Sequence, residues 1–257
     1  MNKLIIKNKK NRVLTSIDEW KKGFVEVDED RHWEKGRSAE RLANDFTNGN
    51  PSSGETSLRQ MLSLFLGTVD VIWKEAYIEA GSVFDSYSRP RMQDLAIWGE
   101  VENKTFFIGV EAKVDESFGS KSVAQQQKYI QELKSNGIST EAGERLNELC
   151  NDFLLKIDKR FYKSIRYQLL YYLAGSFREK ADVIFMPVIV YTSDKYNSKK
   201  GDSNYRSYLT FMQLLGFEEV KVNVPKMKVA FKKIIKAYNK ERNTILTKPV
   251  YSCYFEK

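Results

Sequence analysis

The sequence predicts a mixed α/β fold in which one central sheet is flanked by helices. Segments with the 3.6-residue hydrophobic period of a helix alternate along the chain with short runs rich in β-branched and aromatic residues. Two hydrophobic runs enclose a polar turn at 102–103, which is the pattern of a β-hairpin. The run 181–192 is apolar almost throughout, as expected of a strand that is buried on both faces.

Each element is placed by its own local pattern. Gly67 and Gly216 are expected to end two helices, because glycine readily adopts the left-handed conformation found after a helix C-terminus. The predicted helices span 38–46, 55–66, 123–137, 140–157, 162–177, 205–216 and 225–242. The predicted strands span 76–84, 93–99, 105–114, 181–192 and 217–224. Residues 1–30 are expected to form a polar lead-in with a short strand, and residues 120–160 a helical insertion within the single domain 1–257.

The composition excludes several classes of protein. Hydrophobic residues make up 42% of the 257 residues, so the chain has enough apolar surface for a sizeable core. No apolar stretch reaches membrane-spanning length, and the N-terminal apolar run is too short for a signal peptide. We therefore expect no membrane association and a cytoplasmic location. The net charge of +8 favours a polyanionic partner such as nucleic acid.

Cysteine and histidine are scarce. Cys150 and Cys253 lie far apart and form no C-x-x-C pair, which excludes the usual structural zinc motifs. The one histidine, His32, is too few for a multi-histidine metal site, and we expect it to serve in capping or packing. Carboxylate and lysine side chains are therefore the first groups to consider for catalysis.

Residues 93–113 are expected to form a hairpin whose register is fixed by its hydrophobic pattern. Side chains alternate between the two faces of a strand, and a turn centred on 102–103 pairs Leu95 with Val110. This pairing gathers one apolar face, made of Leu95, Ile97, Ile108 and Val110. A slip by one residue would reverse the faces, so the pattern favours this register.

The opposite face of the hairpin carries three charges at one end. Asp94 lies opposite Glu111 in the predicted register, and Lys113 shares their face. Two carboxylates across a ladder repel and raise one another's pKa unless a cation lies between them. Lys113 supplies one positive charge, whereas a magnesium ion would supply two and takes oxygen ligands. Ala96 and Gly109 are small, which we expect to leave room for a substrate beside the acids.

The same charges have a simpler interpretation. Charged residues at a strand end are often solvated, and Asp94, Glu111 and Lys113 are also compatible with a surface ion network. The two interpretations differ in whether the carboxylates face one side of the sheet closely enough to share a metal ion.

Asp94 on one strand, followed by Glu111-Ala112-Lys113 on the next, resembles the motif of the PD-(D/E)XK nuclease superfamily. That superfamily has a restriction-endonuclease-like core of helix, three-stranded meander, helix and strand, and the predicted order of elements supplies such a core. The residue before Asp94 is Gln93, so the proline of the motif is displaced.

Two further strings add to the resemblance. The string V-E-A-K-V-D-E-S-F-G (110–119), with the upstream W-E-K-G-R-S-A-E-R-L-A (33–43), resembles an uncharacterised bacterial family assigned to the same superfamily. In that family V-E-x-K-V-x-E-x-F-G is the prominent motif, and Glu116, Phe118 and Gly119 fill its second half here.

A helical Q-x-x-x-Y pair also resembles the superfamily. Gln168 and Tyr172 have the spacing that several of its branches place beside the active site. Gln125 and Tyr129 offer a competing match. We favour Gln168, because its helix leads directly into the buried strand 181–192.

The resemblance implies metal-assisted hydrolysis of phosphodiester bonds, with Mg²⁺ or Mn²⁺ as the cofactor. Asp94 and Glu111 would hold the metal together with the backbone carbonyl of Ala112. Lys113 would orient or deprotonate the attacking water, or stabilise the charge on the phosphate. Gln168 would orient the lysine or the metal-bound water.

A further acid from the N-terminal part of the chain is usual in this superfamily. Glu40 is the residue we expect to complete the metal site, and Glu55 and Glu79 are the alternatives.

The segment 225–242 is predicted to be an amphipathic helix. Its apolar stripe consists of Met227, Phe231, Ile234, Ile235 and Tyr238. Its lysines repeat every four residues, at Lys228, Lys232, Lys236 and Lys240. These lysines would neutralise backbone phosphates of a nucleic acid, although a solvated helix face has the same pattern.

The leading hypothesis from the sequence is a metal-dependent nuclease that acts on DNA, in restriction, repair or phage defence. The alternative is a PD-(D/E)XK-fold module that binds nucleic acid or serves as a scaffold without catalysis. The sequence does not decide whether the substrate is DNA or RNA, or whether cleavage occurs at ends or internally. It also leaves open whether the chain forms a homodimer.

Overall fold

The computed structural model describes residues 2–28, 33–49, 51–68, 70–85, 87, 90–239 and 243–257. His32 and Lys240, named above, lie outside these residues. The helices are α1 (Ile17–Asp28), α2 (Ser38–Thr47), α3 (Ser53–Leu66), α4 (Val123–Ser135), α5 (Ala142–Phe153), the 3₁₀-helix η1 (Lys159–Ser164), α6 (Tyr167–Arg178) and α7 (Ser198–Leu214). The strands are β1 (Ile72–Ser82), β2 (Arg91–Val101), β3 (Lys104–Lys113), β4 (Val183–Val190), β5 (Glu218–Val220), β6 (Met227–Asn239) and β7 (Thr244–Glu256).

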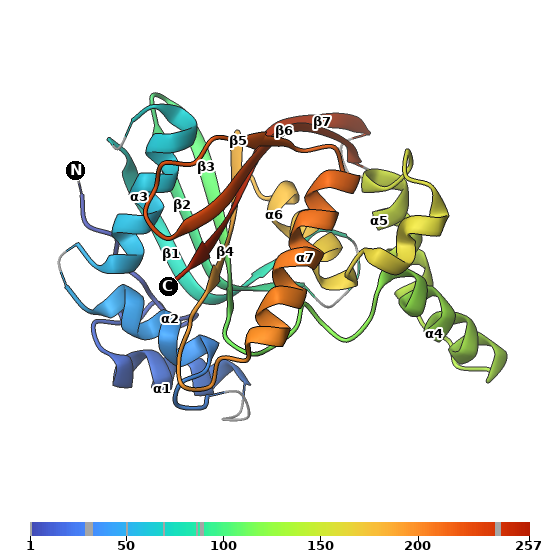
Figure 1. Cartoon of the computed structure of the whole chain (residues 1–257), viewed down its shortest axis with the longest axis horizontal. Coiled ribbons are helices and arrows are strands. Elements are labelled where there is room, and N and C mark those ends of the chain that lie inside the picture. The colour runs from blue at the N-terminus through green and yellow to red at the C-terminus, as the bar shows by residue number, and fades with distance from the viewer. Residues whose placement is uncertain are drawn as a thin grey trace.

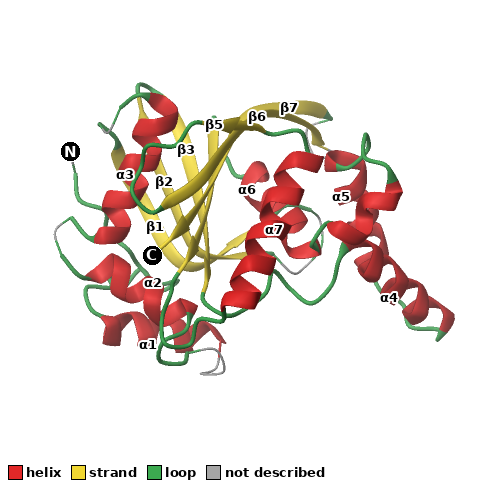
Figure 2. Cartoon of the chain, viewed as in Figure 1, coloured by secondary structure: helices red, strands yellow, loops and turns green. Residues whose placement is uncertain are grey.

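The strands form one seven-stranded mixed sheet in the order β1-β2-β3-β4-β7-β6-β5. β1, β2 and β3 make an antiparallel meander, and β4 lies parallel to β3. β7 is parallel to β4, and β6 pairs antiparallel with both β7 and β5. Helices α1 to α3 lie on one side of the sheet, whereas α5, α6 and α7 lie on the other (Figures 1 and 2). The predicted mixed α/β architecture, with a central sheet flanked by helices, is confirmed.

Two hydrophobic clusters, one on each face of the sheet, make up the core. Successive residues of β3 point into different clusters. Phe106 packs with the residues of α1, α2 and α3, whereas Phe107 packs with those of α5, α6 and α7. Both phenylalanines are completely buried. Because β3 and β4 are covered on both faces, they read as continuous apolar runs.

The hairpin of β2 and β3 has the predicted register. Leu95 pairs with Val110 and Ile97 with Ile108, and the ladder continues to Val101 and Lys104. The two turn residues have positive φ angles, 47° at Glu102 and 64° at Asn103. This is the geometry of the two-residue turn that matches the twist of a hairpin.

The prediction of a helix over 225–242 is wrong, because this segment contains the strand β6. Val229, Phe231 and Ile235 lie on the face toward α7, which is the two-residue period of a strand. Residues four apart share a face in a strand as well as in a helix, so the lysine spacing could not distinguish the two. The deciding factor is the long antiparallel pairing with β7.

Helix α1 was also missed, since residues 1–30 were expected to be a polar lead-in. Trp20 and Phe24 are both buried and lie four residues apart, so they share one helix face. α7 begins at Ser198, before the predicted start at 205, and the Asn197 side chain accepts a hydrogen bond from the Lys200 N–H as its N-cap. In the described part of the chain, no helix has the length and apolar character needed to cross a membrane.

Candidate active site

Three elements carry the predicted catalytic residues: Glu111 contacts both Lys113 and Gln168 between the sheet and α6, and Asp94 lies on the neighbouring strand. Asp94 lies on β2, Glu111 and Lys113 near the end of β3, and Gln168 in the first turn of α6. Gln168 donates a hydrogen bond from Nε2 to Oε1 of Glu111 over 2.7 Å. Lys113 Nζ lies 2.7 Å from the same oxygen. Glu111 is 1% exposed and Lys113 8%, so this is a buried charge cluster and not a solvated strand end.

Arg91 belongs to the same cluster and was missed by the sequence analysis. Its Nη2 forms an ion pair with Oε2 of Glu111, the oxygen that Lys113 and Gln168 leave free. Its guanidinium carbon lies 5.3 Å from the ring centre of Tyr171 and 5.7 Å from that of Tyr172, both on α6. Both oxygens of Glu111 are therefore engaged by positively charged or amide donors.

Asp94 lies at an irregularity of β2. Gln93 Nε2 reaches Ser176 Oγ on the α6 side (3.3 Å), whereas Leu95 packs in the opposite cluster beneath α1 to α3. Residues two apart in a regular strand share a face, so the alternation breaks at Asp94. The ladder with β3 also ends at Leu95, and Oδ2 of Asp94 accepts a hydrogen bond from the Ala112 N–H over 2.6 Å. A carboxylate thus takes the place of a backbone acceptor where the two strands part.

The pKa values of Asp94, Glu111 and Lys113 are all shifted from their ordinary values. Burial, followed by the charge of Glu111, raises the pKa of Asp94 to about 7, although Lys113 and Arg91 oppose this shift. Burial also acts to raise the pKa of Glu111, but Arg91 and Lys113 outweigh it and bring that pKa below its ordinary value. For Lys113, burial is outweighed by Glu111 and Asp94, so its pKa lies above the ordinary value. Glu111 and Lys113 therefore form a charged pair, and Asp94 is the group that can gain or lose a proton near neutral pH.

Asp94 also lines a cavity of about 430 Å³ on the α1 and α2 side of the sheet. Its other lining residues are Trp20, Phe24, Glu34, Arg37, Ser38, Ala39, Leu42, Glu79, Ala112 and Glu116. Glu111 and Lys113 do not line it. Asp94 thus connects the charge cluster to this cavity, which is large enough to admit a ligand.

The three acids considered as the further metal ligand lie in different surroundings. Glu40 accepts a hydrogen bond from the Gly36 N–H over 3.3 Å and does not line the cavity. Glu55 is buried against Arg59 and accepts from Trp73 Nε1, at 2.8 and 3.1 Å. Glu79, on β1, lines the cavity beside Asp94. Of the three, Glu79 is the one that the fold places near the cluster.

Within the described ranges, no group of three or more His, Cys, Asp or Glu side chains is arranged to hold a metal ion. The metal ligands expected from the sequence, Asp94, Glu111 and the Ala112 carbonyl, are all oxygen donors and so have the chemistry that magnesium prefers. One oxygen of Glu111 must however be released by Arg91 before a metal can bind it.

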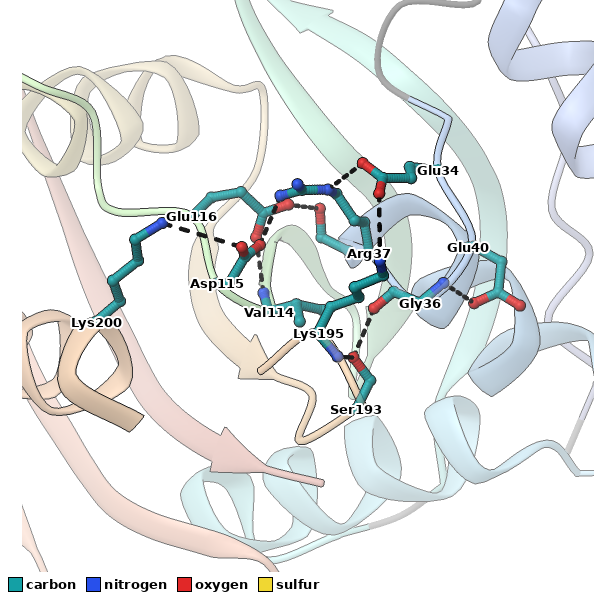
Figure 3. Close-up of polar contacts among 11 residues, drawn as sticks. Glu34, Gly36, Arg37, Glu40, Val114, Asp115, Glu116, Ser193, Lys195 and Lys200 are labelled. Carbon is teal, nitrogen blue, oxygen red and sulfur yellow. Dashed lines mark hydrogen bonds and ion pairs between the residues drawn. The ribbon is translucent and has the colours of Figure 1, made fainter. Parts of the chain in front are cut away.

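The strings 33–43 and 110–119 meet in space. The Ser38 hydroxyl donates to Oε1 of Glu116 (2.8 Å), whose Oε2 accepts from the Val114 N–H (2.8 Å). Arg37 Nη1 lies 2.7 Å from Oδ1 of Asp115, and Figure 3 shows Arg37 between that residue and Glu34. These contacts fix the loop after β3 against the start of α2, and Glu34, Arg37, Ser38 and Glu116 all line the cavity.

A third loop joins this network. The Ser193 hydroxyl donates to the Gly36 carbonyl over 2.6 Å (Figure 3). Gly36 has a φ of +83°, and a Cβ there would lie 2.8 Å from Oδ1 of Asp194. The backbone conformation requires glycine at this position, whereas the contact alone would not, because the exposed Asp194 carboxylate can move aside.

Gly109 and Ala96 do not provide room for a substrate, contrary to expectation. A Cβ on Gly109 would lie 2.9 Å from both Gln93 Oε1 and Ser176 Oγ. Ala96 is completely buried. The space beside Gly109 is filled by the side chains of β2 and α6, and the cavity that Asp94 lines is on the other side of the sheet.

The two Q-x-x-x-Y matches have different roles in the structure. Gln125 completes a capping box at the start of α4, where its Oε1 accepts from the Ser122 N–H over 2.8 Å. Gln168 contacts Glu111, as described above, and the Tyr172 hydroxyl donates to the Gly109 carbonyl (2.5 Å). Gly119 packs against Gln168, since a Cβ there would lie 3.4 Å from Gln168 Cβ. The choice of Gln168 over Gln125 agrees with this placement.

The lysines of β6 do not form one uninterrupted stripe. Lys228 lies at an irregularity in the pairing with β7, forms an ion pair with Glu256 (2.7 Å) and lies over the Tyr205 ring of α7. Lys232 and Lys236 are exposed and alternate with the residues that face α7, so they lie on the opposite side of the sheet. Lys232 also lies 3.7 Å from Glu218 on β5, in an exposed pair, so the predicted stripe is reduced to these two lysines, one of them facing an acid.

Comparison with known proteins shows the family of this chain. A family described as a domain of unknown function (DUF6946) matches residues 13–237, a span that includes every member of the charge cluster. Neither a curated protein nor a solved structure matches the chain. The chain therefore belongs to the DUF6946 family.

Proposed function

We propose that this chain is a metal-dependent phosphodiesterase that cleaves nucleic acid, with DNA as the first substrate to test. The observation that carries the proposal is the contact of buried Glu111 with Lys113 and Gln168, with Asp94 close enough for the charge of Glu111 to raise its pKa. Burying ionised groups costs several kcal/mol each before their mutual attraction is counted. Clusters with such perturbed pKa values occur preferentially at functional sites.

The order of elements supports the same proposal. α3 precedes the antiparallel meander β1-β2-β3, and α6 then leads into β4, which lies parallel to β3. This is the succession of helix, meander, helix and strand that is typical of the PD-(D/E)XK core. In our proposal the motif acids and lysine lie where β2 and β3 part, beside the helix that carries the Q-x-x-x-Y pair.

The proposed cofactor is Mg²⁺ or Mn²⁺, held by Asp94, Glu111 and the Ala112 carbonyl, with Glu79 preferred over Glu40 as the further acid. When bound, such an ion supplies positive charge for the phosphate and lowers the pKa of a bound water.

The chain's own residues have separate roles in this proposal. Lys113 holds a proton at Nζ, where it can hydrogen-bond to an attacking water or to a charged phosphate oxygen. Gln168 orients Glu111 through Nε2. Asp94, whose pKa is raised to about 7, is the carboxylate that faces the cavity.

One observation favours a second candidate, a nucleic-acid-binding module without catalysis. Both oxygens of Glu111 already have donors, from Arg91, Lys113 and Gln168. A cluster that is neutral and complete without a metal would serve structure alone. Nuclease activity decides between the two candidates.

The test is a nuclease assay on single- and double-stranded DNA and RNA, with Mg²⁺, with Mn²⁺ and with EDTA. We expect cleavage by the wild type in the presence of metal, and its loss in Lys113→Ala and Asp94→Asn. Lys128→Ala is the control, because Lys128 is exposed on α4 and lies outside the cluster. Equal activity in wild type and both cluster variants contradicts the roles, and binding without cleavage of any substrate favours the second candidate.

A further inference from the structure

Arg91 occupies the place at Glu111 that a metal ion would need. It contacts Oε2, while Lys113 and Gln168 share Oε1. Arg91 is 8% exposed and Glu111 1%, so their ion pair is shielded from water. Such a pair is far less screened by salt than a surface pair.

Arg91 and Lys113 carry two positive charges, which Asp94 and Glu111 balance when both are ionised, and Glu116 is close enough to act on Glu111 and Lys113 with one more negative charge. A divalent cation added to this set would leave a buried excess of positive charge, which is unfavourable in a poorly solvated site. Displacement of Arg91 from Glu111 removes one positive charge from that excess and frees the ligand oxygen in the same step.

The position of Arg91 is fixed by α6 as well as by Glu111. Its guanidinium lies over the Tyr171 and Tyr172 rings. Gly175 permits this approach, because a Cβ there would lie 3.0 Å from Arg91 Cβ and 3.1 Å from its Cγ. Arg91 Nε has no hydrogen-bond partner among the described residues. The guanidinium is thus held by ring stacking and by one ion pair. Both contacts can break when the Arg91 side chain moves to another position.

We propose that Arg91 is an internal competitor of the divalent cation at Glu111, so that its displacement sets the metal affinity of the site. This inference rests on the proposed function in one respect, the assignment of Asp94 and Glu111 as metal ligands. It adds a residue that the motif does not contain, and it predicts weak metal binding in the resting protein.

The experiment measures Mn²⁺ binding by calorimetry, without nucleic acid, for the wild type and Arg91→Met. Methionine keeps much of the side-chain volume and removes the charge. We expect the Kd for Mn²⁺ to fall about tenfold or more in Arg91→Met, within the range by which residues around a metal site change affinity. Adding Asp94→Asn to Arg91→Met should abolish this gain, because it weakens a ligand of the same ion.

Arg59→Met is the matched control. Arg59 forms an ion pair with buried Glu55 (2.8 Å) and lies over the Trp73 ring, so the environment resembles that of Arg91. If any buried carboxylate freed of its arginine bound Mn²⁺, Arg59→Met would gain affinity too. We expect no gain there, since Glu55 lies apart from Asp94 and Glu111.

An unchanged or higher Kd in Arg91→Met overturns the proposal. Arg91→Lys covers the case in which the methionine variant fails to fold, because it retains the charge on a shorter side chain that cannot form the planar ion pair. Its Kd should fall between those of the wild type and Arg91→Met, and a Kd equal to that of the wild type would also overturn the proposal. If Arg91→Met binds Mn²⁺ more tightly but no variant cleaves nucleic acid, the nuclease function is contradicted and the role of Arg91 in metal affinity is supported. If the wild type cleaves nucleic acid but Arg91→Met does not change the Kd for Mn²⁺, the nuclease function is supported and the role of Arg91 is contradicted.

Discussion

Gln168 on α6 donates a hydrogen bond to Glu111 on β3, and this contact joins two segments that are separated in sequence by α4, α5 and η1. Gln168→Leu removes the donor and leaves Oε1 of Glu111 to Lys113 alone. We expect turnover in the nuclease assay to fall about 10- to 100-fold, because a group that orients a ligand is lost.

Gln125→Leu is the matched control for this prediction. It removes the competing Q-x-x-x-Y glutamine, which caps α4. That variant should lose about 1 kcal/mol of stability and keep its turnover per folded molecule. Equal losses of turnover in both variants would show that the effect of Gln168 comes from stability alone.

Asp94 gives the stability of the protein a pH dependence. Its pKa is raised from 3.8 in the unfolded chain to about 7, so the native state binds an extra proton between these pH values. Stability contributed by this group is therefore present at low pH and is lost as pH rises toward 7. Asp94→Asn keeps an oxygen acceptor for the Ala112 N–H and abolishes the titration.

We expect Asp94→Asn to gain on the order of 2 kcal/mol relative to the wild type between pH 5 and pH 8. Urea unfolding of both proteins at the two pH values, with EDTA present, measures this difference. Other titrating groups are common to both proteins and cancel. A difference that stays constant with pH would place the Asp94 pKa near its ordinary value.

Gly109→Ala should destabilise the fold without blocking the site. The new Cβ would meet Gln93 Oε1 and Ser176 Oγ, both at 2.9 Å, between β2 and α6. Overpacking of this kind costs about 1–3 kcal/mol, which thermal unfolding would detect. Unchanged stability with loss of substrate binding would instead mean that Gly109 borders the substrate.

Lys232 and Lys236 are the described lysines of β6 that we expect to contact nucleic acid. If both contact phosphates, Lys232→Ala with Lys236→Ala should lower the slope of log K against log salt by about one unit for each contact. Fluorescence anisotropy with a labelled DNA duplex at several salt concentrations measures the slope. The double variant Lys128→Ala, Lys134→Ala on α4 has the same net charge, and an equal change there would indicate a general charge effect.

The hairpin was the most predictable part of the site. Alternation fixed Leu95 opposite Val110, and the positive φ angles at Glu102 and Asn103 fit the predicted turn. The order of elements also indicated the helix of Gln168, which the structure places in contact with Glu111. These features depend on local periodicity and on the order of elements, both of which are visible in one sequence.

The remaining features depend on long-range contacts. Arg91 reaches Glu111 because the alternation of side chains along β2 breaks at Asp94. The position of such a break cannot be predicted from the sequence of a strand. β6 could not be distinguished from a helix without knowledge of β7, whose pairing decides its conformation. Glu79 could not be preferred over Glu40, because only the packing of α1 and α2 against β1 decides which acid lines the cavity.

The ends of the helical insertion are pinned together by the backbone. Val123 N–H donates to the Ile165 carbonyl (2.8 Å), and Tyr167 N–H donates to the Lys121 carbonyl (3.1 Å). The chain thus leaves and re-enters the body at one point, immediately before α6, while α4 projects away from the sheet (Figure 1). Closing such a loop costs little more for a long segment than for a short one. Within this segment α5 packs into the core through Leu146 and Leu149, whereas the turn between α4 and α5 (136–139) is exposed. That turn is therefore the place where evolution or an engineer can add or exchange residues to change what the protein contacts, while Gln168 stays in register with Glu111.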